Sequence, residues 1–116
     1  WSPIHRKGRS PRTLSRIEAG RRAFGSRFLA PFYGSGSGTT GRSLDRPIGT
    51  LTTRARWALI DGDRMRMVRA VEGRALMGFP ADYMLPANEA QAWHLIGNAV
   101  APVQACDVID ALRMAA

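Results

Sequence analysis

The chain has 116 residues, of which 45% are hydrophobic, and a net charge of +8 at pH 7, which suits one small domain with a modest core. The single cysteine, Cys106, excludes an internal disulfide, and one cysteine with two scattered histidines gives no metal-ligand spacing, so we expect no metal. No uninterrupted apolar run approaches the about 18 residues of a membrane-spanning helix, so we expect no membrane partner.

The first predicted element is a helix over residues 10–24, "SPRTLSRIEAGRRAF". Ser10 is a suitable N-cap, Pro11 suits the first helical position, and Gly20 weakens the middle. The apolar side chains at helical spacing are Leu14, Ile17 and Phe24. Residues 28–33, "FLAPFY", contain a proline and predict an edge strand or an extended segment.

Residues 34–41, "GSGSGTTG", predict a flexible loop. With Phe32 before it, the loop is similar both to the Phe-x-Gly-x-Gly loop that holds nucleotide cofactors and to a phosphate-binding loop. Both interpretations need a context that is absent, because no Lys-Ser/Thr pair follows and no helix begins after the glycines. The pattern therefore favours a plain surface loop or a loop on a DNA-facing side.

The middle of the chain predicts strands, a turn and a helix. Residues 49–60 are rich in Thr, Leu, Trp and Ile, which predicts two short strands or one bent strand. "DGD" at 61–63 predicts a turn. Residues 64–68 alternate arginine and methionine, as in a half-buried strand with Met65 and Met67 on one face. Residues 69–77 predict a helix.

The last part of the chain predicts two further helices. Residues 78–86, "GFPADYMLP", form a loop with two large aromatic side chains, and Asn88 can cap a short helix through Leu95. The Gly97-Asn98 pair then predicts an interruption of the helix, and Pro102 begins a final helix. The apolar face of that helix holds Val103, Cys106, Ile109 and Leu112.

The basic charge is concentrated in the first two thirds of the chain. Residues 1–29 have a net charge of +7, residues 30–74 have +4, and residues 75–116 have −3. This asymmetry favours a polyanion as partner of the basic part and a protein as partner of the acidic end. A solvated basic surface without a partner is the alternative.

"RALMGFPADY" and "AWHLIGNAVAP" are the most distinctive motifs of the chain, and the second follows the first by about 18 residues. They resemble the last two motifs of cytosine-5 DNA methyltransferases, a helix leading into Gly-Phe-Pro-x-Asp-Tyr and then Ile-Gly-Asn-Ala-Val-x-Pro. Upstream, "SPRTLSRIEAGRRAF" and "FYGSG…SLDRPIGTLTTRARWALI" resemble the segment that enters and forms the target-recognition region of bacterial and phage members. The resemblance covers nearly the whole chain.

The chain also departs from that family. Its Pro-Cys-Gln loop with the nucleophile, its Glu-Asn-Val motif and its cofactor loop are absent, so the chain resembles the last third of such an enzyme. No catalytic residue is therefore expected, and Cys106 is interpreted as a small core residue. Val68-Arg69 stands where the family has Leu-Thr, and Gly73-Arg74 replaces an apolar pair, although Glu72 fits the family's glutamate. Gly73 should weaken its helix by up to about 1 kcal/mol.

The resemblance implies a DNA-binding role for the segment around residue 50. The family flips a target cytosine out of duplex DNA, and the recognition region grips phosphates and reads base edges. Thr50-Leu51 matches the family's Thr-Leu dipeptide, whose threonine lies near the backbone of the flipped base. Arg54 and Arg56 are spaced to share one face of a strand and could face DNA. The alternatives are threonines that merely favour a strand and arginines that are merely solvated.

The resemblance also implies a role for the Gly-Asn break. In the family this turn returns the chain to the catalytic domain and places asparagine beside the pocket for S-adenosylmethionine. Gly97 would permit the tight turn, and the residues expected at the cofactor are Asn98, Ala99 and Val100. The alternative is a break between two helices with Asn98 as a local cap.

Together these observations predict an α+β fragment. Residues 1–67 would form the basic helix and the mixed target-recognition region, and residues 68–116 a helical segment returning to the catalytic domain. The final helices would pack on a doubly wound, Rossmann-like methyltransferase domain outside the chain. The expected activity is methyl transfer to cytosine in double-stranded DNA, in the cytoplasm of a bacterial or phage-infected cell, within a restriction-modification context. A non-catalytic basic DNA-binding module or an inert remnant is the alternative.

Overall fold

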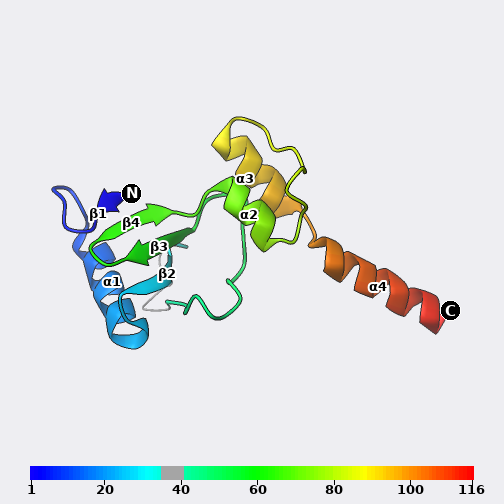
Figure 1. The fold of residues 1–116 in the computed structure, drawn as a ribbon, viewed down its shortest axis with the longest axis horizontal. Helices are drawn as coiled ribbons and strands as arrows, with labels where there is room; N and C mark the ends of the chain where they lie inside the picture. The colour runs from blue at the N-terminus through cyan, green and yellow to red at the C-terminus, as the bar shows by residue number, and fades with distance from the viewer. Residues whose placement is uncertain (35–40) are drawn as a thin grey trace. The chain divides into compact units, whose positions relative to one another are not determined.

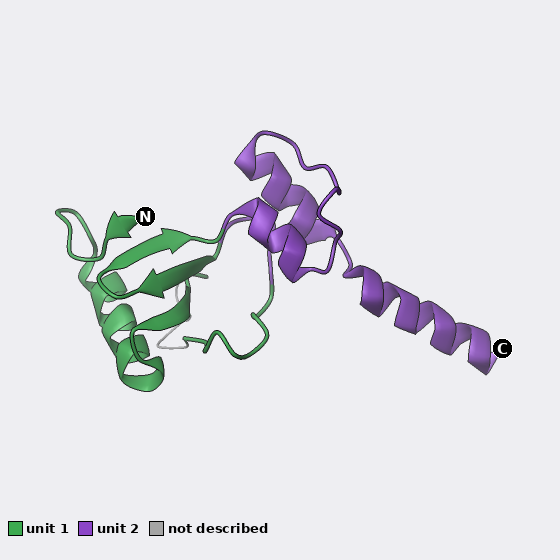
Figure 2. Cartoon of the chain, in the orientation of Figure 1, with its two compact units in different colours: residues 1–50, 56–68 green, residues 51–55, 69–116 purple. Residues whose placement is uncertain are grey.

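The computed structural model describes residues 1–34 and 41–116 and has a mixed α+β fold (Figure 1). The predicted loop over residues 34–41 lies almost wholly outside the described residues. The chain divides into two compact units, unit 1 with residues 1–50 and 56–68, and unit 2 with residues 51–55 and 69–116 (Figure 2). The segment 51–55 thus belongs to a different unit from the residues on either side of it.

Unit 1 is built on an antiparallel sheet with the strand order β1-β4-β3-β2 (Figure 1). The strands are β1 (Ser2–Pro3), β2 (Arg27–Pro31), β3 (Trp57–Asp61) and β4 (Arg64–Met67). The predicted edge strand is confirmed, because β2 ends the sheet. The predicted turn is confirmed too, since Gly62 joins β3 to β4 with a φ of 56°.

Helix α1 (Pro11–Phe24) packs against β2 and closes the core of unit 1. The core side chains come from α1, from alternate positions of the strands and from Ile4; they are Ile4, Ile17, Phe28, Ala30, Ala58, Ile60 and Met65. Met65 is buried and alternates with Arg64 and Arg66, as the sequence predicts, but Met67 at the end of the strand is 39% exposed. The predicted N-cap is confirmed, because the Ser10 hydroxyl accepts a hydrogen bond from the Thr13 amide at 3.2 Å.

The strand prediction for residues 49–60 is only partly right. The strand begins at Trp57, and residues 49–56 lie in no strand. The indole of Trp57 explains the difference: its Nε1 donates to the Thr50 carbonyl at 3.1 Å, so that acceptor is used by a side chain. A Cβ on Gly49 would lie 2.7 Å from the same ring. The segment is therefore held against Trp57 instead of extending β3.

Unit 2 contains α2 (Ala70–Leu76), α3 (Glu89–Asn98) and α4 (Pro102–Ala115). Helices α2 and α3 pack together around Trp93, which is buried. Gly73 faces the Trp93 ring, and a Cβ there would lie 3.0 Å from the ring. The glycine that lowers the helix propensity of α2 thus lets an indole pack closely against it.

Helix α4 has no buried residue, and Cys106 is exposed. The interpretation of Cys106 as a core residue is therefore wrong for this chain. The physical reason is that nothing in the described chain covers the apolar face of α4, on which Ile109 and Leu112 are also exposed.

By length and composition alone, the stretch Glu89–Ala115 is apolar enough to cross a membrane, with a mean hydropathy of 1.3 over its best 18 residues. The stretch contains no long uninterrupted apolar run, because polar residues such as His94 and Asn98 divide it. The stretch consists of α3 and α4, and residues 99–101 between them are not helical. One such stretch is weak evidence for a membrane span, since core helices of soluble proteins have the same composition.

Gly20 offers a test of how α1 packs. Replacing a helix glycine with alanine normally stabilises a helix by up to about 1 kcal/mol. Here the added Cβ would lie 2.1 Å from the fully buried Phe28 ring. We expect Gly20→Ala to lower the free energy of unfolding by about 1–3 kcal/mol, measured by urea unfolding. Ser15→Ala, at an exposed position of the same helix, should be neutral or slightly stabilising; equal stability of the two variants would contradict the packing.

Candidate functional site

The Gly97-Asn98 pair does not interrupt helix α3, contrary to the prediction from the sequence. Helix α3 continues through Asn98 and ends at Ala99, whose φ of −78° and ψ of 154° are extended. The Ala99 amide still donates to the Ile96 carbonyl at 3.2 Å. The φ of Gly97 is not in the positive region, so this glycine is not needed for a turn.

Gly97 is needed for a close approach between two segments of unit 2. A Cβ at this position would lie 2.2 Å from the Thr53 amide nitrogen and 2.3 Å from the Thr52 carbonyl carbon. These are backbone atoms, which cannot rotate away as a side chain can. The last turn of α3 therefore packs directly on the backbone of the "TLTT" segment, and only glycine leaves enough room. The structure thus brings together the predicted recognition segment and the predicted cofactor motif.

The segment 51–55 forms a local turn rather than a strand. The Thr52 hydroxyl donates to the Arg54 carbonyl at 3.1 Å and accepts from the Arg54 amide at 3.4 Å. Such a threonine turn competes with strand pairing for the same backbone groups. The expectation that Arg54 and Arg56 share one face of a strand is therefore wrong.

The two arginines lie in different surroundings. Arg54 is exposed and belongs to unit 2, and its guanidinium makes no hydrogen bond or ion pair with another described residue. Arg56 belongs to unit 1 and is half-buried. Its guanidinium donates to the Phe32 carbonyl at 3.4 Å, and its own carbonyl accepts from the Phe32 amide at 2.6 Å. Arg54 is thus available to a ligand, whereas Arg56 also holds the chain beyond β2.

Thr50 is anchored through its backbone while its side chain remains at the surface. Its carbonyl accepts from the Trp57 indole at 3.1 Å and from the Tyr33 hydroxyl. The rings of Tyr33 and Trp57 meet edge to face with centroids 5.9 Å apart. The Thr50 residue is exposed, and Leu51 after it is half-buried. Two aromatic side chains therefore fix the backbone at Thr50.

The three residues predicted at the cofactor lie at the end of α3 and just after it. Asn98 is exposed, and its amide makes no hydrogen bond with another described residue. Ala99 is half-buried, and Val100 is 65% exposed. The Asn98 amide and the extended backbone of Ala99 therefore leave hydrogen-bonding groups at the surface.

The motif "GFPADY" ends α2 with a well-defined cap. Gly78 has a φ of 79°, its amide donates to the Ala75 carbonyl at 3.0 Å, and the Phe79 amide donates to the Arg74 carbonyl at 3.1 Å. This pair of bonds is the Schellman cap, which favours glycine at the left-handed position. Beyond it, the Phe79 and Tyr83 rings stack with centroids 4.7 Å apart. The Gly-Phe pair of the motif is therefore explained by its local structure.

Two carboxylates, one from α2 and one from α3, accept hydrogen bonds from backbone amides at the start of α2. Glu72 accepts from the Arg69 amide at 2.9 Å, and Glu89 at the start of α3 accepts from the Ala70 amide at 2.6 Å. Asn88 caps α3 as predicted, since its side chain accepts from the Gln91 amide at 3.1 Å. The Glu89 contact spans 19 residues, so no local pattern could reveal it. Glu72 thus caps α2, and Glu89 connects the start of α3 to the start of α2.

Charge is divided unequally between the two units. Unit 1 contains thirteen Arg or Lys residues and four acidic residues, for a net charge of +9. Unit 2 contains four Arg and five acidic residues, for a net charge of −1. Almost all of the attraction for a polyanion therefore resides in unit 1.

Within the described residues, no group of three or more His, Cys, Asp or Glu side chains could hold a metal ion. No protein-family model, no curated protein and no solved structure matches the chain.

The contact at Gly97 gives a prediction for unit 2. Gly97→Ala should separate α3 from residues 51–55, because backbone atoms 2.2–2.3 Å from the new Cβ have to move. We expect faster amide hydrogen exchange in α3 and residues 51–55, and a loss of about 1–3 kcal/mol in unfolding free energy. Asn98→Ala, at the exposed neighbouring position, is the matched control and should leave exchange at residues 51–55 unchanged. Wild-type exchange in Gly97→Ala would refute the contact.

Proposed function

We propose that the chain is the target-recognition region and C-terminal segment of a DNA cytosine-5 methyltransferase. The observation that supports this most is the packing of Gly97 on the Thr52–Thr53 backbone. This contact joins Gly97 of the "IGNAVAP" motif, which the resemblance places beside the cofactor, to the two threonines that follow the Thr-Leu dipeptide.

The charge distribution supports duplex DNA as the partner. Unit 1, with its net charge of +9, would neutralise phosphates. Thr50 ends the first stretch of this unit, and Leu51 begins the segment 51–55 of unit 2. The Thr50 hydroxyl would donate to a phosphate oxygen, and Arg54 would contact the backbone or a base edge. These contacts would help offset the few kcal/mol required to flip a cytosine out of the stack.

The exposed apolar face of α4 supports a partner domain. Val103, Ile109 and Leu112 are each at least half exposed in this chain. In the proposed enzyme, this face packs on the doubly wound catalytic domain, which also brings the Pro-Cys-Gln nucleophile. Asn98, Ala99 and Val100 would then border S-adenosylmethionine, which supplies the methyl group. The enzyme would act in the cytoplasm of a bacterial or phage-infected cell, in a restriction-modification context.

A non-catalytic DNA-binding module is the second candidate, and the charge of unit 1 alone favours it. Both candidates bind DNA, but only the methyltransferase needs the end of α3 at a cofactor. Asn98 therefore distinguishes the two, because DNA binding by a simple module has no use for its unpaired amide.

We expect the 116-residue chain alone to transfer no methyl group, because it lacks the nucleophile motif, the Glu-Asn-Val motif and the cofactor loop. Joined to the N-terminal catalytic portion of a cytosine-5 methyltransferase, it should restore transfer of labelled methyl groups to duplex DNA.

In that enzyme, Asn98→Asp should weaken S-adenosylmethionine binding by about five- to 150-fold, since a donor is lost and a charge is added. DNA binding and thermal stability should not change. Unchanged cofactor binding, or methyl transfer by the isolated chain, would contradict the proposal.

DNA binding by the chain itself should depend steeply on salt. Each neutralised phosphate contributes about 0.9 log units of affinity per log unit of salt. Arg54→Ala should lower this slope by about one unit, because the Arg54 guanidinium is exposed. Arg54→Lys, which keeps the charge, is the matched control and should keep the slope. A slope that is the same for all three proteins would mean that Arg54 does not contact DNA.

A further inference from the structure

A pocket of about 320 Å³ lies in unit 1, between the first turns of α1 and the chain that follows β2. Three arginines line it, Arg12 and Arg16 of α1 and Arg56 just before β3. The described lining residues include no aspartate or glutamate. We call this cavity the arginine pocket. Its volume is at the lower end of the range for small-ligand sites, about 300–1,000 Å³, which suits a small anion or one group of a larger ligand.

Phe32 holds two of these arginines in place through groups that carry no formal charge. The guanidinium carbon of Arg16 lies 4.9 Å from the centroid of the Phe32 ring. The Arg56 guanidinium donates to the Phe32 carbonyl at 3.4 Å, and the Arg56 carbonyl accepts from the Phe32 amide at 2.6 Å. A ring and a carbonyl attract a guanidinium group but do not cancel its charge. These contacts therefore orient the two side chains without neutralising them.

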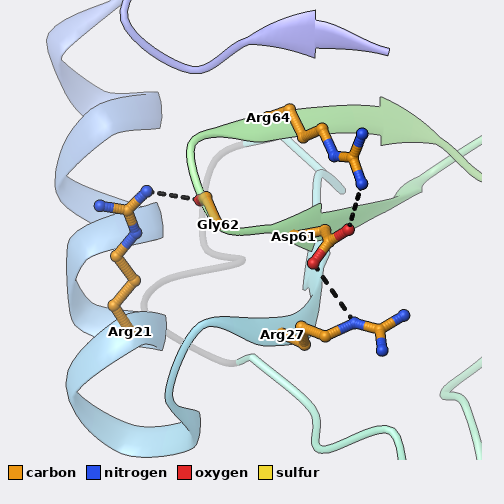
Figure 3. A network of polar contacts seen from close by, with 5 residues as sticks. All are labelled: Arg21, Arg27, Asp61, Gly62 and Arg64. Carbon is orange, nitrogen blue, oxygen red and sulfur yellow. Dashed lines mark hydrogen bonds and ion pairs between the residues drawn. The ribbon is translucent and has the colours of Figure 1, made fainter.

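The acidic residues of unit 1 make their contacts outside this pocket. Figure 3 shows Asp61 on the sheet between two other arginines, with Oδ1 3.3 Å from Arg27 Nε and Oδ2 2.9 Å from Arg64 Nη2. The other three acids of the unit each contact a different residue: Asp63 with Arg21, Glu18 with Arg22, and Asp45 with Ser43. Arg12 and Arg56 form no ion pair with any described residue, so the charges of these two are available to a ligand.

Helix stability does not explain the position of Arg12. It lies in the first turn of α1, where the helix dipole favours an acid and disfavours a cation, and this turn contains no acid. Arg16 lies one turn further along the same side of α1, and two like charges four residues apart repel each other. A bound anion would reduce both unfavourable interactions. The arrangement therefore fits a binding pocket better than a structural role.

Two hydroxyl groups add a hydrogen-bond donor to the lining of the pocket. Ser10 Oγ and Thr13 Oγ1 are 2.9 Å apart, so one of them donates to the other. Ser10 Oγ also accepts from the Thr13 amide at 3.2 Å, which caps α1. Each hydroxyl has one hydrogen, so the hydroxyl that does not donate within the pair keeps its hydrogen for a ligand. The site thus does not depend on the end of the helix itself, whose Thr13 amide is already bonded.

We propose that the arginine pocket binds a phosphate group of the DNA backbone. The planar guanidinium fork matches two phosphate oxygens at once, and a third oxygen can accept from a hydroxyl. A free phosphate offers the same chemistry, but the DNA binding proposed above, on which this choice of ligand rests, makes the phosphodiester the ligand. The contact is independent of base sequence and would fix the position of α1 on the duplex, because it engages phosphate alone.

The pocket itself can be tested with inorganic phosphate and the wild-type 116-residue chain. Phosphate should shift the backbone amide NMR signals of Arg12, Thr13 and Arg56, whereas chloride at the same ionic strength should not. Arg12→Gln should weaken phosphate binding by about two- to fivefold, the size of one exposed ion pair. Arg22→Gln is the matched control, because it removes the same charge from a 77% exposed side chain of α1 outside the pocket. It should leave phosphate binding unchanged. Equal shifts with phosphate and chloride would overturn the inference.

Duplex DNA is the second arm of the experiment and should shift the same three amide signals. Arg12→Gln should weaken DNA binding by up to about eightfold at 0.1 M salt and lower the salt slope by about 0.9, whereas Arg22→Gln should change both far less. DNA that binds without shifting these signals, and equally to both variants, would overturn the inference and leave the proposed function standing. Phosphate binding in the pocket by a chain that binds no DNA would identify free phosphate as the ligand and overturn the proposed function.

Discussion

The close approach of Gly97 to the backbone of Thr52 and Thr53 is the constraint on which the second unit depends. It places five residues from the middle of the chain, 51–55, in the same unit as the helices that follow Val68. A backbone-to-backbone contact of this kind tolerates no side chain, so one residue type decides whether the two segments meet. Thr52 then folds the segment into its own turn, and Arg54 is left exposed at the surface.

In unit 1, the close contacts at glycine positions involve side chains instead of backbone atoms. The Phe28 ring packs against Gly20. The Trp57 ring packs against Gly49, and its indole nitrogen donates a hydrogen bond to the Thr50 carbonyl. The same sheet separates an apolar face from a charged face by the alternation of its side chains. One face is an apolar core against α1, and the other presents Arg27, Asp61 and Arg64. The excess positive charge of the protein lies on unit 1.

Local patterns predicted the elements that depend on local physics. The Ser10 cap, the β3–β4 turn at Gly62 and the Asn88 cap each arise within a few residues, and each was predictable. The sequence failed where a distant partner decided the outcome. The sequence around Gly97 indicated a turn, because the segment that requires a glycine there lies more than forty residues earlier in the chain. Residues 49–56 looked like a strand because nothing local shows that Trp57 takes the Thr50 carbonyl. Cys106 looked buried because helical spacing shows an apolar face but not whether the chain covers it.

The path of the backbone between the two units has a consequence for dissecting this protein. The chain passes from one unit to the other after Thr50, again after Ala55 and finally after Val68. Neither unit is a continuous piece of polypeptide, so cleavage after Val68 does not yield two intact halves. The C-terminal product would keep α2, α3 and α4 but lose residues 51–55, and the surface beside Gly97 would open to water. The N-terminal product would keep those residues without the helix they rest on. Unit 1 thus keeps all of its residues in the N-terminal product, whereas unit 2 is complete only in the uncut chain.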